Sequence, residues 1–201
     1  MKLLRRVLFL SLLCLLMASP ALAAEPLRIA LLPVQDETGA LDRDDIALLT
    51  GRLQQEIHIP LNGTLGIAVY QDPAAAQEAL YKVLDAQPLP PGKKRRKPDH
   101  KAAVQELAKS IDADLVIYLR VCAYHQWLRH SIEEGIIIEA VVDMRLEAYD
   151  ARQGRLVHDT ATRYVHEPYS VNNSLQALSA DALDELLERA KLRQAIYPQA
   201  H

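Results

Sequence analysis

The sequence predicts a single α/β domain in which a mixed sheet of about five strands is flanked by helices. Three observations lead to this prediction. Short apolar runs alternate with segments whose apolar residues recur at helical spacing. One long segment after the middle of the chain alternates apolar and polar residues with a period of two, and Gly, Pro and Asp mark the boundaries between segments. The 201 residues are 50% hydrophobic and 24% charged, which is typical of one globular domain with a full core.

Residues 1–23 are predicted to be a cleaved secretory signal peptide. Lys2, Arg5 and Arg6 form a positive region, an apolar stretch runs from Val7 to Met17, and small residues lead to a cleavage site after Ala23. The apolar stretch is shorter than the roughly 20 residues that span a bilayer, which argues against a retained anchor. The protein is therefore expected to be extracytoplasmic, either periplasmic or secreted, with residues 24–201 forming the globular domain.

Removal of this segment changes the charge balance and the cysteine count. The whole chain has 23 basic and 26 acidic residues and a net charge of −3. Three basic residues lie in the segment, so 20 basic and 26 acidic residues remain, a net charge of −6. Such an acidic chain argues against a nucleic-acid binder. Cys14 lacks the small residue that lipid attachment requires before it, so no stable membrane anchor is predicted. Cys122 is expected to be buried as a small hydrophobic residue.

The first elements of the domain are a strand and a helix. The apolar run 27–34 predicts a buried strand, and the polar residues 36–39 predict the turn that follows it. Apolar residues from Ile46 to Ile57 recur at helical spacing, and Pro60 ends this helix. Carboxylates at its start cap the first turn and face the positive end of the helix dipole. These carboxylates belong to Asp42, Asp44 and Asp45.

A second strand and two further helices come next. Residues 66–70 predict the strand. The pair Asp72-Pro73 begins a helix, because Asp is a favoured cap and Pro is favoured at the first helical position. Asp99 is expected to cap a third helix, whose apolar face extends to Ile111.

The rest of the chain predicts three strands and a terminal helix. A strongly apolar strand runs from residue 114 to about 127, and a turn at 150–154 leads to a last strand from 155 to about 166. Between them, residues 136–148 form a strand whose even-numbered residues are apolar and face one way. The opposite face is expected to be wetter and carries Glu139, Asp143, Arg145 and Glu147. The terminal helix begins near residue 173, so the order of elements is βαβααβββα.

Three segments of the domain form a familiar combination. They are IALLPVQDETG at 29–39, LAKSIDADLVI at 107–117 and RLEAYDARQGRLV at 145–157. Together they resemble a bacterial envelope superfamily that includes the TolB N-terminal domain, the curli secretion lipoprotein and the lipoprotein activator of penicillin-binding proteins. The resemblance implies a mixed sheet flanked by helices, a role in protein–protein interaction at the cell envelope, and no catalytic residues. Lipidated members carry a cysteine just after the signal peptide, where this chain has Ala24-Glu25.

The sequence lacks the strong catalytic and metal-binding motifs. Its seven glycines fit neither a dinucleotide-binding turn nor a P-loop, and it has no C-x-x-C or H-E-x-x-H pattern. We therefore predict no catalytic residue, no metal ligand and no cofactor, and we expect a protein that is not an enzyme. The alternative is an extracytoplasmic metal-dependent or small-molecule enzyme whose site assembles from scattered residues. It is supported by the last strand, which carries His158 and His166, and by an acidic cluster that either binds calcium or caps helix ends. The cluster comprises Asp36, Glu37, Asp42, Asp44 and Asp45.

Two groups of residues are candidates for binding a partner. The Pro-rich loop 88–98 provides a concentrated positive charge for an anionic surface or an acidic partner, or is simply a solvated loop. Its cations are Lys93, Lys94, Arg95, Arg96 and Lys97. Tyr124 and Trp127 either form a recognition patch, because aromatic residues dominate interface hot spots, or cover the edge of the core. The predicted function is that of an assembly or accessory factor that binds another envelope protein. A homo-oligomer that pairs through the last strand is a further alternative.

Overall fold

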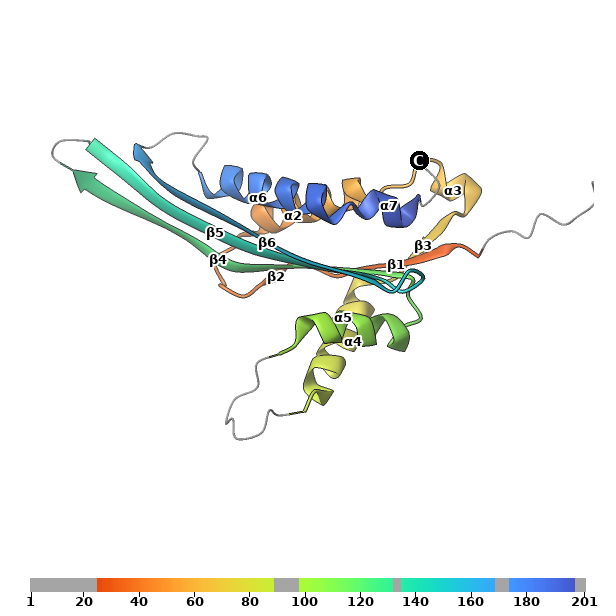
Figure 1. Ribbon diagram of the computed structural model, residues 1–201. Coiled ribbons are helices and arrows are strands. Elements are labelled where there is room, and N and C mark those ends of the chain that lie inside the picture. The colour runs from red at the N-terminus through yellow and green to blue at the C-terminus, as the bar shows by residue number, and fades with distance from the viewer. Residues whose placement is uncertain (1–24, 89–97, 132–134, 169–173, 198–201) are drawn as a thin grey trace, which may run out of the picture.

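The computed structural model describes residues 25–88, 98–131, 135–168 and 174–197. It is a mixed α/β structure in which helices cover both faces of a six-stranded sheet (Figure 1). The predicted fold class and the predicted order of the main elements are confirmed. The additional elements are short: strand β2 (Gln35–Asp36) and helices α3 (Asn62–Leu65) and α7 (Leu192–Ile196). The predicted signal peptide and the five cations of the basic loop lie outside the described residues.

The sheet has a parallel half and an antiparallel half. Its order is β3 (Ala68–Tyr70), β1 (Leu27–Leu31), β4 (Leu115–Ser131), β5 (Gly135–Asp150) and β6 (Arg155–Pro168). Strand β1 pairs in parallel with β3 and β4, whereas β4, β5 and β6 form an antiparallel meander; β2 pairs in parallel with β4. The predicted hairpin turn lies between β5 and β6, and the long strands of the meander provide the surface on which the site is built.

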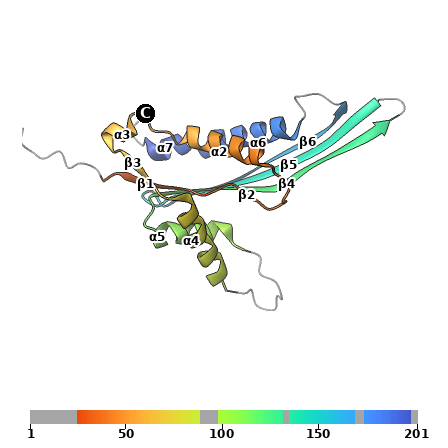
Figure 2. The ribbon, with the colours of Figure 1, turned by 180° about the vertical axis from the view of Figure 1, so that it is seen from behind.

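Helices α2 (Arg43–Glu56), α6 (Leu175–Ala190) and α7 cover one face of the sheet, and α4 (Pro73–Ala86) and α5 (His100–Ser110) cover the other (Figures 1 and 2). A side-chain oxygen caps the start of each of the four longer helices by accepting backbone N–H groups, as expected for Asp and Ser at this position. The capping residues are Asp42, Asp72, Asp99 and Ser174.

Two hydrophobic cores follow from the alternation of side chains along the strands. In β4, Ile117 and Leu119 face α2 and α6 and belong to the larger core, whereas Val116 and Tyr118 face α4 and α5 and belong to the smaller one. The smaller core ends at Tyr118. The next side chain on that face of β4 is Arg120, so polar residues take over where the cover of α5 ends.

The strands of the meander continue past both helices α4 and α5 as an arm (Figures 1 and 2). A register shift between Val121 and Ala123 in β4 marks its start. We use "arm" for residues 123–131, 135–143 and 162–168. One face of the arm packs against α6, and we call the opposite face, on which no described helix lies, the open face. Strand β4 alone has 17 residues, a length of roughly 50 Å at about 3.3 Å per residue.

Three expectations about burial are wrong in detail. Ile136, predicted to be on the covered face of β5, is exposed because it lies at the tip of the arm. Glu147, predicted to be on the wetter face, is wholly buried because Arg120 pairs with it inside the molecule. Cys122, predicted to be buried, is half-buried. No helix in the described part of the chain is both long and apolar enough to cross a membrane.

Candidate functional site

A polar pocket lies at the root of the arm, where the N-terminal end of α5 meets the face of the sheet. It is a cavity of about 710 Å³, within the usual range for small-ligand sites, roughly 300–1,000 Å³. Strands β4, β5 and β6 supply its floor, and α4, α5 and β2 supply its walls. Its polar lining residues are Gln35, Glu37, Tyr81, Asp99, His100, Lys101, Tyr118, Arg120, Arg145, Glu147 and His158.

The strand register places the residues of the floor in two rows. Tyr118, Glu147 and His158 lie side by side on β4, β5 and β6. Arg120 and Arg145 form the next row on β4 and β5. Because side chains two apart on a strand point the same way, both rows face the same side of the sheet.

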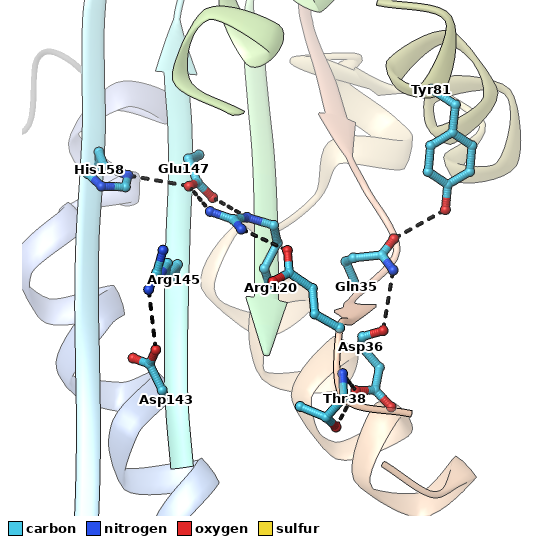
Figure 3. Close-up of polar contacts among 10 residues, drawn as sticks. Gln35, Asp36, Thr38, Tyr81, Arg120, Asp143, Arg145, Glu147 and His158 are labelled. Atoms are coloured by element: carbon cyan, nitrogen blue, oxygen red, sulfur yellow. Dashed lines mark hydrogen bonds and ion pairs between the residues drawn. The ribbon is translucent and has the colours of Figure 1, made fainter. Parts of the chain in front are cut away.

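A buried ion-pair cluster occupies the centre of the pocket (Figure 3). Arg120 Nη2 lies 2.6 Å from Glu147 Oε1, Arg120 Nε lies 3.3 Å from Glu147 Oε2, and Arg120 Nη1 lies 2.8 Å from Glu37 Oε1. His158 Nδ1 lies 3.3 Å from the same Oε1 of Glu147. All three guanidinium nitrogens of Arg120 therefore have a carboxylate partner, as a buried charge requires.

This cluster fixes the protonation of the groups around it. Burial alone would lower the pKa of Arg120, but its hydrogen bonds to Glu147 and Glu37 outweigh burial and raise the pKa further above its usual value. Burial likewise opposes ionisation of Glu37, but the hydrogen bond and charge of Arg120 lower the Glu37 pKa. Burial and the charge of Arg120 lower the pKa of His100. At neutral pH Arg120 and Glu37 are therefore ionised and the imidazole of His100 is neutral.

Neither the pocket nor the cysteine beside it offers an activated nucleophile among the described residues. Burial, followed by the charge of the lining residue Glu37, raises the pKa of the neighbouring Cys122 thiol to about 11, and a thiol rather than a thiolate is unreactive at neutral pH. Burial also raises the pKa of the Tyr118 phenol. The arrangement therefore suits the binding of a polar group better than covalent catalysis.

The structure separates the two aromatic residues predicted to form a patch. Tyr124 is 5% exposed, belongs to the larger core, and donates a hydrogen bond of 2.7 Å from its hydroxyl to Asp45 Oδ2. Trp127 is 51% exposed and lies on the open face of the arm, because it is three positions after Tyr124 and side chains at odd spacing on a strand point to opposite faces. Of the two interpretations, covering the core therefore applies to Tyr124, and a position on a surface patch applies to Trp127. That Trp127 binds a partner stays a prediction.

Trp127 shares the open face with further aromatic and imidazole side chains. Its indole ring lies 5.8 Å from the ring of His125. Tyr164 on β6 is 63% exposed and aligns with His125 through Val141 of β5. In the row of Trp127, His166 Nδ1 lies 3.1 Å from Glu139 Oε1. The open face thus presents two exposed aromatic rings beside polar groups, a composition typical of interfaces.

The predicted acidic cluster is not a single site. Asp36 accepts hydrogen bonds from the turn that follows it, Asp42 caps α2, and Asp45 binds Tyr124. Glu37 belongs to the polar pocket. Capping of α2 therefore rests on Asp42 and not on all three aspartates at its start. The described residues include no group of three His, Cys, Asp or Glu side chains that could hold a metal ion.

Sequence reasoning missed the centre of the polar pocket. The residue in the sequence that could have indicated this pocket is Arg120, which interrupts the otherwise apolar run from Leu115 to Val121. A charge within a buried strand needs a buried partner. The partner Glu147 lies 27 residues away, and only the register between β4 and β5 brings the two together.

No family model and no curated protein matches the sequence. The fold is similar to that of solved bacterial proteins. The PelC dodecamer from Paraburkholderia phytofirmans is 17% identical, with 82% of this chain and 86% of that chain covered and a TM-score of 0.41. A lipoprotein from Neisseria meningitidis is 17% identical, with 81% and 99% covered and a TM-score of 0.38. The LpoB C-terminal domain from Escherichia coli is 14% identical, with 72% and 87% covered and a TM-score of 0.29. The likeness to these proteins is one of fold alone.

Proposed function

We propose that this chain is an exported, non-catalytic protein of the bacterial cell envelope that acts as an assembly or accessory factor by binding another envelope protein through the open face of the arm. The observation that carries this proposal is the exposure of Trp127 and Tyr164 on a sheet face that no described helix covers. Large aromatic side chains that are half exposed or more add little to the stability of the monomer, but they are the residues that contribute most at interfaces.

The polar pocket agrees with a binding role. Two of its carboxylates are held by Arg120, and the thiol of Cys122, beside the lining residue Glu37, has a raised pKa, so its described groups lack the paired base and nucleophile of covalent catalysis. The predicted signal segment and the resemblance to an envelope superfamily point to the same location. The basic residues Lys93 to Lys97 remain a second predicted contact, directed at an anionic surface or an acidic partner.

Recovery of partners from envelope extracts tests the proposal. The double variant Trp127→Ala/Tyr164→Ala should lose the bound envelope protein, whereas Leu65→Ala should retain it. Leu65 is a suitable control because it is also an exposed hydrophobic residue, 61% exposed, but lies on α3, away from the arm. A variant with all five cations from Lys93 to Lys97 changed to Gln tests the basic loop separately. Retention of the same partner by the double variant would contradict the proposed role of the open face.

A homo-oligomer is the second candidate, because β6 is the last strand in the order of the sheet and runs for 14 residues. A long edge strand is a template for pairing with another chain. Native mass measurement distinguishes the candidates: a monomer that captures a different envelope protein supports the first, and a defined oligomer of this chain alone supports the second.

A further inference from the structure

Two nitrogen atoms in the polar pocket are buried without a hydrogen-bond partner among the described residues, Arg145 Nε and His100 Nδ1. Buried polar atoms are nearly always paired, so an unpaired one is a place where a water molecule, an ion or a ligand group supplies the partner. We propose that the polar pocket is a binding site for the carboxylate group of a small polar ligand, held by Arg145 and His100. This site is separate from the open face of the arm and does not depend on the function proposed for that face.

Arg145 is the anchor of the proposed site. Its guanidinium makes one ion pair, with Asp143 at 3.6 Å, and no hydrogen bond to a described residue. The Nε–H and a neighbouring Nη–H of an arginine form a fork that matches the two oxygens of a carboxylate. Figure 3 shows Arg145 on the same strand as Glu147, with its contact directed to Asp143 and away from the Arg120 cluster.

The charges in the pocket leave Arg145 without a close anionic partner. Arg145 lies directly opposite Arg120 in the register of β4 and β5, and like charges opposite each other on adjacent strands are unfavourable. Glu147 and Glu37 compensate Arg120. Arg145 has only the distant contact with Asp143, so a carboxylate from a ligand would supply the close partner that the strands do not provide.

The same balance favours a single negative charge over a dianion. Besides two histidines, three Lys or Arg and three Asp or Glu side chains line the cavity, and the carboxylates of Glu147, which is buried, and Glu37 would repel a doubly charged phosphate. His100 adds a hydrogen-bonding group without adding a charge, because its lowered pKa keeps the ring neutral at neutral pH. With the ring proton on Nδ1, it donates to the second oxygen of the ligand.

The carboxylate could belong to a free amino-acid-like molecule or to the C-terminus of a peptide, and the experiment separates these sources. Protein purified after export is titrated with N-acetylalanine, with the acetylated tripeptide of alanine, and with the C-terminal amide of each. NMR follows the Nε–H resonance of Arg145 and the ring resonances of His100. We expect both acids to give saturable shifts of these resonances and both amides to give none. At least tenfold tighter binding of the tripeptide acid identifies a peptide terminus; equal affinity identifies a small molecule.

Variants tie the binding to Arg145. Arg145→Gln should weaken binding of the acids about tenfold or more, because it removes a charge-assisted hydrogen bond. Arg52→Gln should leave the affinity unchanged. The two arginines are matched, with side chains 41% and 43% exposed, but Arg52 lies on α2, on the other face of the sheet, where it pairs with Asp184.

Three results would overturn the proposal: no saturable shift with either acid, equal binding of acid and amide, or undiminished affinity in folded Arg145→Gln. The comparison of acid with amide needs no variant and therefore does not depend on whether Arg145→Gln folds.

Discussion

The guanidinium of Arg120 is held by both carboxylate oxygens of Glu147, at 2.6 Å and 3.3 Å, and the two side chains are 5% and 0% exposed. This pair joins neighbouring strands at the point where the smaller core ends and the polar pocket begins. A buried ion pair is costly to break on one side only, because the remaining charge keeps its desolvation cost and loses its partner.

Glu147→Gln is therefore expected to lower the free energy of unfolding by about 3 kcal/mol, the lower end of the range for breaking a buried pair, because Glu37 still compensates Arg120. Urea denaturation at neutral pH measures this change. Glu106→Gln is the control. It removes an exposed pair with Lys109 on α5 and should change the unfolding free energy by no more than about 0.5 kcal/mol. Equal effects of the two substitutions would show that the buried pair contributes little.

The different positions of Tyr124 and Trp127 predict opposite behaviour on substitution. Tyr124→Phe removes the hydroxyl that binds the buried carboxylate of Asp45 and is expected to cost about 1–3 kcal/mol of unfolding free energy. Trp127→Ala, on the open face, is expected to change the unfolding free energy by less than about 1 kcal/mol and to impair partner recovery instead. Urea midpoints and partner recovery are measured for both variants. A large loss of stability in Trp127→Ala would mean that the ring serves the fold rather than an interface.

Much of the fold could be predicted because its signals are local. Asp72-Pro73 and Asp99 mark helix starts because a capping side chain bonds to N–H groups a few residues along the chain. The alternation in residues 136–148 predicts β5 because successive side chains of any strand point to opposite faces. The polar pocket could not be predicted, because it depends on the register between strands. The pairing of Arg120 with Glu147 and the position of Arg145 opposite Arg120 follow from which residues of β4 and β5 align. Without that register, Glu147 looks like one more polar residue on a wet strand face.

Two glycines are expected to respond in opposite directions to the same substitution. Gly154 ends the turn between β5 and β6 with φ +63°, a conformation that side chains with a Cβ rarely adopt. Gly154→Ala is expected to lower the unfolding free energy by about 1 kcal/mol. Gly51 lies inside α2, and an added Cβ would meet no atom within 4 Å, so Gly51→Ala is expected to raise the unfolding free energy by about 0.5–1 kcal/mol. Urea denaturation of both variants measures the changes, and a shift of the same sign in both would contradict this account.

The lowered pKa of His100 predicts a specific loss of stability on mild acidification. Burial and the charge of Arg120 depress the pKa of His100 in the folded protein below 6.5, the ordinary value that the ring has in the unfolded chain. Between the two pKa values the unfolded chain binds a proton that the folded protein does not bind, so the unfolding free energy rises with pH in this window. The contribution is complete above pH 6.5 and decreases as the pH falls from there towards the folded-state pKa. Urea denaturation at about pH 7.5 and about pH 5.5 brackets the start of this window.

His100→Gln removes the proton-binding group and should therefore reduce the difference in unfolding free energy between the two pH values. His58→Gln, a substitution at an exposed histidine after α2 and outside the pocket, is the control for the change from His to Gln itself. The other histidines are common to all three proteins and cancel in the comparison. If His100→Gln retains the full pH dependence, the imidazole is not held neutral by the pocket, and the hydrogen-bonding role proposed for His100 loses its basis.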